Sequence, residues 1–310
     1  MKALAIAALT ATLLPSLAWA QPSTTTSLDA NSTSTPATTR EEVAAAPAQS
    51  ESSPYLSDWL TQHINVIGSH GIRFGPKPVD DMYLEYEFMG RKGPWDLYGY
   101  IDAPRIFGIG NSNDTGAWNK GSPMFWELEP RLSIDKLTHT KLGFGPFKEF
   151  YVAADDIFDW GHNMQNRQHT LYIGLGTDID THSPVNLSFN LYGRRQFENY
   201  GASNDFGWDG YRAQVKYIWP LTKVWGGALT WVGFTNYDFG SDLARDNPGL
   251  RTNHALVSTN VLSLSWTHWA ISGVARYFHN GSNWKAGAQL GEDKVKTTGW
   301  GEYLILTYSF

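Results

Sequence analysis

The sequence of 310 residues contains no cysteine, which excludes a disulfide scaffold, an iron–sulfur cluster, a thiolate zinc site and a cysteine nucleophile. Charged residues are scarce, at 17% of the chain against about 25% in an average soluble domain. The net charge is −6, whereas a nucleic-acid-binding protein usually has a basic face. We therefore expect no nucleic-acid partner. After residue 54, no apolar run approaches the ~20 residues of a membrane-spanning helix.

Glycine and aromatic residues are abundant instead. The chain has 30 Gly, 14 Trp, 15 Tyr and 15 Phe. All of the glycines and 43 of the 44 aromatic residues lie in residues 54–310. This composition favours a single β-rich domain over that range.

The first 53 residues have a different character. Lys2, the apolar run 3–14 and the small residues Ala18 and Ala20 predict a signal peptide over residues 1–20. An uncleaved anchor is the alternative, but this run is too short to span a bilayer. Residues 21–53 are rich in Ser, Thr and Ala and predict a disordered N-terminal segment, since they cannot bury enough apolar surface to fold. An interaction arm or a glycosylated stalk is the other interpretation of this segment.

Residues 54–310 show repeated alternation of apolar and polar side chains, the period of a β-strand. In 184–194, Leu187, Phe189 and Leu191 share one face, and Asn190 and Arg194 share the other. We count twelve such segments, near residues 60–74, 82–92, 95–103, 122–134, 147–158, 167–179, 184–198, 208–219, 224–239, 253–266, 268–280 and 298–310. The intervening gaps are alternately short and long, with 219–223 expected to form a tight turn.

This pattern predicts an all-β fold, a closed antiparallel transmembrane β-barrel of about twelve strands in the bacterial outer membrane. Two further features favour it. Many segments begin or end in aromatic residues suited to the membrane interfaces, namely Trp95, Trp208, Trp225, Trp231, Tyr237, Trp266, Trp269 and Trp300. The chain also ends on Phe310, in the last alternating segment. A soluble secreted sandwich or jelly roll is the alternative that the local pattern leaves open.

From residue 55 onward, the sequence resembles the nucleoside-specific outer-membrane channel proteins of the Tsx type. The resemblance rests on long, ordered motifs at 55–59, 73–76, 83–87, 98–104, 118–138, 144–151, 174–181, 208–212, 233–243 and 298–301. It implies a monomeric twelve-stranded barrel in outer-membrane lipid, with a narrow lumen that passes nucleosides and deoxynucleosides. It also implies a receptor role for bacteriophages or colicins in some members. Segment 21–53 is longer than this family leads us to expect.

Assigning the polar strand faces to the lumen predicts a substrate pathway. Aromatic rings can stack on a base, and charged or amide groups can bind ribose hydroxyls. Phe74 is included because pairing should end at Gly75-Pro76, where the ring could turn into the pore mouth. The predicted pathway residues are Phe74, Tyr83, Glu85, Tyr98, Tyr100, Asp102, Glu127, Arg131, Tyr172, Asn190, Arg194, Phe234, Asn236 and Arg276. The alternative for each charged residue is that it only neutralises a neighbour.

Other function classes find less support. The pairs Glu85/Glu87 and Glu127/Glu129 resemble glycosidase acids, but their spacing simply places both members on one strand face, and no nucleophile elbow is present. Segment 178–181 begins like a calcium loop but lacks its remaining ligands. We therefore expect no enzyme, no metal and no cofactor. A pore for short sugars, and a surface receptor or adhesin with little transport, remain open as alternatives.

Overall fold

The computed structural model describes residues 59–111, 122–161 and 163–310. The signal peptide and the N-terminal segment predicted above lie outside the described residues. The strands of the main sheet are β1 (Trp59–Ile72), β2 (Val79–Lys92), β3 (Trp95–Ala103), β4 (Phe125–Leu128), β5 (Arg131–Ser133), β6 (Phe147–Asp159), β7 (Gln168–Ile179), β8 (Asn186–Asn199), β9 (Trp208–Val224), β10 (Gly227–Phe239), β11 (His254–Ser265), β12 (Trp269–His279) and β15 (Gly299–Ser309). The connections contain the helices α2 (Ile134–Thr138) and α3 (Leu243–Asp246), the 3-10 turns η1 (Met164–Asn166) and η2 (Gly281–Asn283), and the hairpin β13 (Gln289–Leu290) and β14 (Asp293–Lys294). No helix in the described part of the chain is long and apolar enough to cross a membrane.

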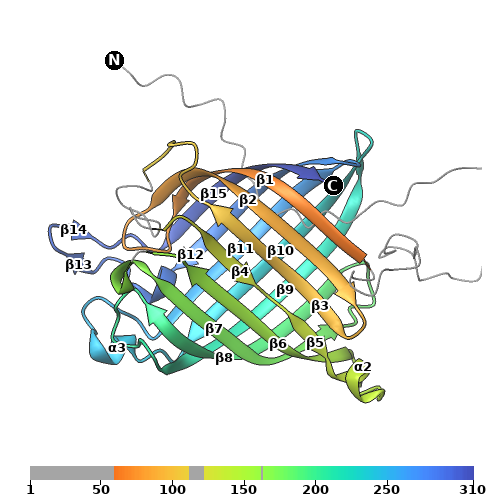
Figure 1. The fold of residues 1–310 in the computed structure, drawn as a ribbon, viewed down its shortest axis with the longest axis horizontal. Coiled ribbons are helices and arrows are strands. Elements are labelled where there is room, and N and C mark those ends of the chain that lie inside the picture. The colour runs from red at the N-terminus through yellow and green to blue at the C-terminus, as the bar shows by residue number, and fades with distance from the viewer. Residues whose placement is uncertain (1–58, 112–121, 162) are drawn as a thin grey trace, which may run out of the picture.

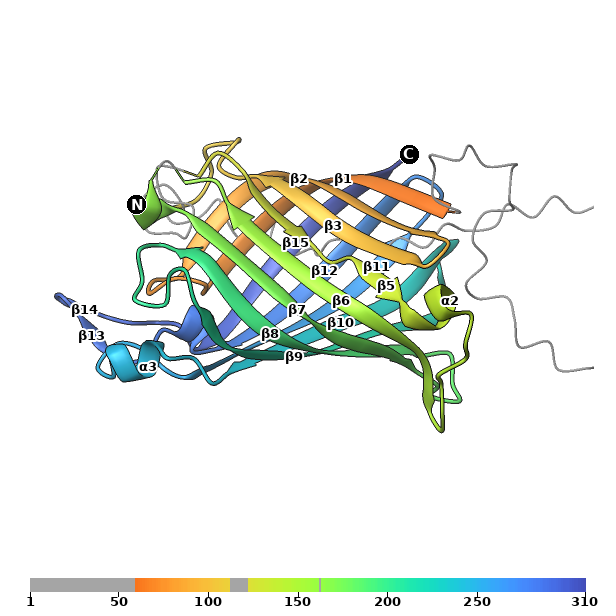
Figure 2. The same cartoon turned by 60° about the horizontal axis from the view of Figure 1, so that its bottom comes forward.

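The main sheet closes into an antiparallel barrel of tilted strands (Figures 1 and 2). Sequential strands pair with each other, and β1 pairs with both β2 and β15. The short strands β4 and β5 lie end to end between β3 and β6, so together they act as one of twelve barrel strands. The break between them falls at Pro130, which has no backbone N–H to donate. The predicted fold class is confirmed.

The two ends of the barrel differ. We call the end that joins β2 to β3, β5 to β6, β7 to β8, β9 to β10 and β11 to β12 the turn end. The opposite end, which joins β1 to β2, β3 to β4, β6 to β7, β8 to β9, β10 to β11 and β12 to β15, is the loop end. Helix α3 and the β13–β14 hairpin lie at the loop end, and α2 and the C-terminus lie at the turn end (Figure 1).

Alternation sorts the side chains into an outer and an inner set. On β7 and β8, Leu175 is 61% exposed and Leu191 is 47% exposed, whereas Tyr172, Asn190 and Arg194 are all buried. The eight aromatic residues expected at the membrane interfaces are all exposed. This distribution, with an apolar outer surface and a polar interior, is the inverse of that in a soluble protein and matches a barrel surrounded by lipid.

Two details differ from the sequence-based expectations. The expected tight turn at 219–223 is wrong, because β9 continues past Pro220 to Val224 and the chain turns at Trp225 and Gly226. A register shift at Leu229/Thr230 of β10 accommodates this proline. In addition, part of the interior is apolar, where Ile67, Val261 and Ile305 pack together in one cluster.

Gly174 provides a test of the strand packing. A Cβ atom added to Gly174 would lie 1.9 Å from the carbonyl oxygen of Leu191 on β8. We therefore expect Gly174→Ala to lower the free energy of unfolding by about 1–3 kcal/mol, as overpacking does. Urea unfolding from lipid vesicles, followed by tryptophan fluorescence, measures it. Gly68→Ala is the matched control, since its Cβ would lie 4.0 Å from the nearest atom. Equal unfolding midpoints for the two variants would contradict the register of β7 and β8.

Candidate functional site: the barrel lumen

A single cavity of about 680 Å³ runs through the barrel interior. Its lining reaches from Asp180 and Ser183 at the turn end to Asn199 and Asn283 at the loop end. All fourteen residues of the predicted pathway line this cavity: Phe74, Tyr83, Glu85, Tyr98, Tyr100, Asp102, Glu127, Arg131, Tyr172, Asn190, Arg194, Phe234, Asn236 and Arg276. The lumen is therefore lined by the residue types that the alternation assigned to it.

One wall of the lumen carries acidic side chains from adjacent strands. Glu85 on β2 lies opposite Asp102 on β3 in the strand register. Tyr100 lies opposite Glu127 on β4 and donates a hydrogen bond to its carboxylate. The Asn65 amide of β1 donates to Glu85 Oε1 at 2.7 Å. Within the described residues, Glu85, Asp102 and Glu127 form no salt bridge, and Asp102 Oδ1 has no hydrogen-bond partner, so this oxygen is available as an acceptor.

A guanidinium group surrounded by aromatic rings lies on another part of the wall. Arg276 donates from Nε to Thr259 Oγ1 at 2.9 Å and from Nη1 to Tyr303 OH at 2.6 Å. Its Cζ atom lies 5.7 Å from the ring centroids of both Phe74 and Phe234, within range of a cation–π interaction. Phe74 is held in turn by an edge-to-face contact with Phe278. These residues form a partly apolar, positively charged surface that can contact a flat molecule.

A second basic group crosses the interior in the middle of the barrel. Arg212 on β9 binds Asp155 of β6 at 2.7 Å and Asp238 of β10 at 2.7 Å. Its guanidinium also lies 3.7 Å from the Tyr172 ring centroid. Lys216, four residues further along β9 on the same face, pairs with Glu129. The contact with Asp155 links two strands that are not neighbours in the sheet, and together these contacts stabilise the shape of the lumen wall.

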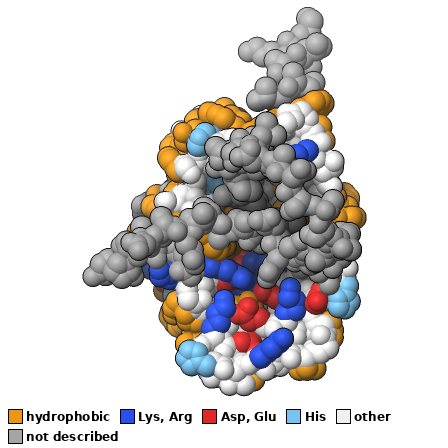
Figure 3. Space-filling model, turned by 90° about the vertical axis from the view of Figure 1, so that its right-hand side faces the viewer, with side chains coloured by type: hydrophobic (Ala, Val, Ile, Leu, Met, Phe, Trp, Pro, Cys, Tyr) orange, Lys and Arg blue, Asp and Glu red, His pale blue; other side chains and the backbone are white. Residues whose placement is uncertain are grey.

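Charge pairs also mark the turn end of the lumen. Arg131 binds Asp96 at 2.5 Å and Asp178 at 2.8 Å, and Arg91 binds Asp96 at 2.9 Å. Tyr151 donates to the same Asp178 at 2.9 Å. Figure 3 shows this end of the molecule, where basic and acidic side chains lie side by side. Arg91 and Arg131 both have acidic partners, so this region presents mixed charge to the lumen.

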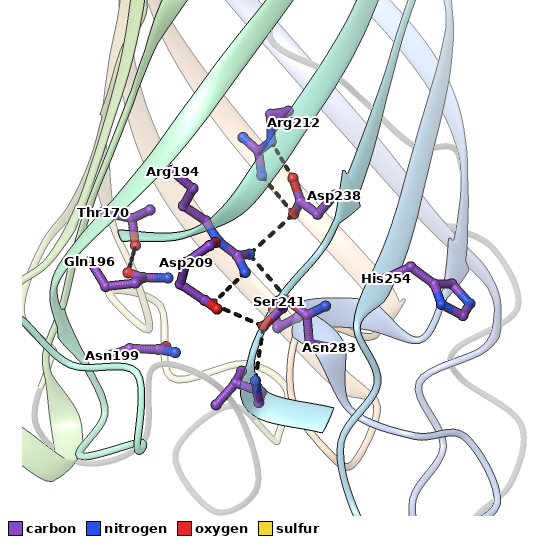
Figure 4. A network of polar contacts seen from close by, with 12 residues as sticks. Thr170, Arg194, Gln196, Asn199, Asp209, Arg212, Asp238, Ser241, His254 and Asn283 are labelled. Atoms are coloured by element: carbon purple, nitrogen blue, oxygen red, sulfur yellow. Dashed lines mark hydrogen bonds and ion pairs between the residues drawn. The ribbon is translucent and has the colours of Figure 1, made fainter. Parts of the chain in front are cut away.

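At the loop end, a buried ion pair joins β8 to β9. Arg194 Nη2 binds Asp209 Oδ2 at 2.7 Å, and both side chains are almost fully buried (Figure 4). The same carboxylate accepts a hydrogen bond from Ser241 at 2.9 Å. Thr170 and Gln196 form a separate buried hydrogen bond nearby, at 2.6 Å.

Sequence reasoning missed several members of these networks, among them Asp155, Asp209, Arg212 and Lys216. The signal for two of them was present, since Arg212 and Lys216 alternate along the segment 208–219 with outward-facing Tyr211 and Val215. Among the described residues, no group of three or more His, Asp or Glu side chains is arranged to hold a metal ion.

Comparison with known proteins identifies the family. The model of the family described as "Nucleoside-specific channel-forming protein, Tsx" matches residues 56–310. The chain belongs to this family. It is 53% identical to the nucleoside-specific channel-forming protein Tsx of Salmonella typhimurium over 270 residues, which is 86% of this chain and 93% of that protein. It is 51% identical to the protein of the same name from Escherichia coli O157:H7, covering 85% of this chain and 92% of the relative.

A more distant relative is an outer membrane protein. OmpK of Vibrio parahaemolyticus is 29% identical over 263 residues, covering 83% of this chain and 90% of that protein. The family and the barrel together identify this chain as an outer-membrane channel protein rather than an enzyme.

Arg212 provides a test of the networks that hold the lumen. Arg212→Leu would leave Asp155 and Asp238 buried without their cation, and we expect it to lower the free energy of unfolding by about 3–5 kcal/mol. Equilibrium unfolding in urea from lipid vesicles measures the loss. The control is Arg245→Ala, which removes exposed ion pairs with Asp242 and Asp246 and should cost about 1 kcal/mol or less. Equal losses for the two variants would contradict a structural role for the buried network.

Proposed function

We propose that this protein conducts nucleosides across the outer membrane through the described lumen. The observation that supports this most directly is that Phe74, Phe234 and Arg276 line the same cavity as carboxyl groups that form no salt bridge within the described residues. A nucleoside has the same division, with a flat base and a polar ribose. The family name supports the same substrate class.

The base and the ribose would use different parts of the wall. A base can stack on an aromatic ring or a guanidinium plane whatever its identity, because each base has a π-face. The ribose hydroxyl groups donate hydrogen bonds, and the oxygen atoms of a carboxyl group accept them. Glu85, Asp102 and Glu127 supply such acceptors in neighbouring positions. A donor-rich ribose and an acceptor-rich wall are complementary, which supports the proposed substrate class.

Passage also requires weak binding. A channel must bind its solute well enough to admit it and weakly enough to release it, which several modest sites along a pore achieve. The mixed charge at the turn end, the Arg212 network further inside and the aromatic group with Phe74 toward the loop end provide such a series. By the usual arrangement of outer-membrane barrels, the loop end faces the exterior and the turn end faces the periplasm.

A sugar pore is the competing transport function. Aromatic residues beside charged ones would also suit short sugars, and the family membership is what favours nucleosides. The monomeric state and the receptor role for a bacteriophage or colicin rest on the family resemblance and stay predictions.

The stacking role of Phe74 is tested by single-channel recording in a planar bilayer. We expect adenosine and thymidine to block the ion current in a concentration-dependent way, and maltotriose to have little effect. Phe74→Ala should weaken the nucleoside block about tenfold, since stacking on one ring contributes roughly 1–3 kcal/mol. Phe144→Ala is the matched control, because this ring is 65% exposed and does not line the cavity. Preferential block by maltotriose would move the protein to the sugar pores.

The acceptor role of the acidic wall is tested by changing the sugar. Asp102→Gln or Asp102→Asn replaces the carboxyl group by an amide, which both accepts and donates hydrogen bonds. We expect weaker block by thymidine, and little change in the block by 2′,3′-dideoxythymidine, which lacks the 3′-hydroxyl. The measurement is the ratio of the two inhibition constants in the parent and the variant. An unchanged ratio would show that Asp102 does not bind the ribose.

A further inference from the structure

Asp209 accepts more hydrogen bonds than the pairing with Arg194 requires. Its carboxylate accepts from Arg194 Nη2 at 2.7 Å, Asn204 Nδ2 at 2.6 Å, Ser241 Oγ at 2.9 Å and the backbone N–H of Asp242 at 2.6 Å. Asn204 lies in the connection between β8 and β9, and Ser241 and Asp242 open the connection between β10 and β11. One carboxylate on β9 therefore binds two loops at the loop end directly.

A third loop is bound through Arg194. The second guanidinium nitrogen of Arg194 donates to Asn283 Oδ1 at 3.2 Å, in the connection between β12 and β15 (Figure 4). Asn283 also donates to the carbonyl oxygen of Thr252 at 3.2 Å, so two loops meet at this side chain. Arg194, Ser282 and Asn283 all line the lumen cavity. The contacts of Asp209 thus reach the cavity wall.

The backbone around Asn283 needs external support. Asn280, Ser282 and Asn283 have φ angles of 52°, 50° and 62°, in the left-handed region that costs energy for residues with a side chain. Such conformations persist where the surroundings fix them. Here Asn283 is buried and its side chain contacts Arg194 and Thr252, while Arg251 binds the carbonyl oxygen of Ser282 and the Asn280 N–H binds Thr298.

Arg194 depends on Asp209 for its own position. Arg194 also binds the carbonyl oxygen of Asp209 through Nε at 2.6 Å, while its next acidic neighbour, Asp238, is 3.9 Å away. The Arg194 side chain is 4% exposed and that of Asp209 is 1% exposed, so water does not replace a lost partner. Removal of the carboxylate would leave the buried guanidinium charge unpaired, which strongly destabilises the local structure around it.

We propose that Asp209 is a positioning residue for the loop-end entrance of the nucleoside pathway: it holds Arg194 and the three loops so that Asn283 forms the outer part of the lumen wall and restricts entry there. This inference rests on the proposed function, because it concerns entry into the same cavity. Asp209 does not line the cavity itself and acts through Arg194, Ser241 and Asn283.

The test compares nucleoside entry from the two ends of the channel. Full-length channels inserted from one side of a planar bilayer are exposed to thymidine on either side, and the association rate of block is measured. Asp209→Asn keeps the size of the side chain but removes its charge. We expect the association rate from the loop end to rise about fivefold or more, the lower range of coupling between sites. The rate from the turn end should not change, and a general loss of stability would not produce this asymmetry.

Two controls make the test specific. Asp246→Asn removes the same charge from α3 at the loop end, where its carboxylate binds the exposed Arg245, and it should leave both rates unchanged. In an Arg194→Gln background, Asp209→Asn should add less than it does in the parent, because the contact of Arg194 with Asn283 is already lost and only the direct contacts of Asp209 with Asn204, Ser241 and Asp242 remain. If Asp209→Asn does not insert as a barrel, Asn283→Ala replaces it, since this variant removes the contact between Arg194 and the third loop.

The inference is overturned if the loop-end rate of Asp209→Asn equals that of the parent, or if the rates from both ends change equally. If nucleosides do not block even the parent, the proposed function fails instead. The positioning role is then decided by the open-channel ion current, which Asp209→Asn should increase and Asp246→Asn should not. An unchanged current in both variants overturns the role in that case.

Discussion

The structure depends on one constraint, that every backbone N–H and C=O group in the hydrocarbon layer needs a partner within the protein. An unpaired group there costs several kcal/mol, so a sheet in lipid has to close. Here β1 completes the closure by pairing with both β2 and β15. Closure gives every strand one face toward lipid and one toward the interior, and the alternation of the sequence follows from it. Pro130 is tolerated because the sheet is interrupted there between β4 and β5.

The enclosed interior also limits which polar groups of the lumen wall can contact a solute. Charged groups away from bulk water need partners, and Arg212, Arg131 and Arg194 each have at least one carboxylate within 3 Å. These pairs fix the wall. Arg276 differs, because its guanidinium donates hydrogen bonds to the hydroxyl groups of Thr259 and Tyr303. The residues without a salt bridge are concentrated where Arg276, the aromatic rings and the acidic wall meet. That concentration is the physical basis for locating substrate contacts there.

Much of this arrangement could be predicted from the sequence, because one-face alternation is a local property. Tyr172, Asn190 and Arg194 were assigned to the interior from their neighbours alone, and they line the cavity. The turn at Trp225 was missed because Pro220 resembles a turn residue, and only the register shift in β10 explains how β9 continues. The apolar cluster of Ile67, Val261 and Ile305 was missed because alternation cannot say which of two apolar faces points inward.

The pairings inside the lumen could not be predicted from the sequence. Arg212 and Asp155 lie 57 residues apart on strands that are not neighbours, so their contact depends on barrel diameter and strand stagger. Asp209 belongs to a recognisable motif at 208–212, but its role appears only when three separate loops are seen to meet around it. Local pattern therefore defines the wall, and tertiary geometry defines its networks.

The most direct test of the central claim is the equilibration of solutes into liposomes that contain the purified barrel. Thymidine and adenosine should equilibrate faster than glucose, a smaller solute with more hydroxyl groups, and their flux should saturate with concentration because the solute binds inside the lumen. Equal rates for nucleosides and glucose, or a faster rate for glucose, would contradict the account of the lumen as a nucleoside pathway.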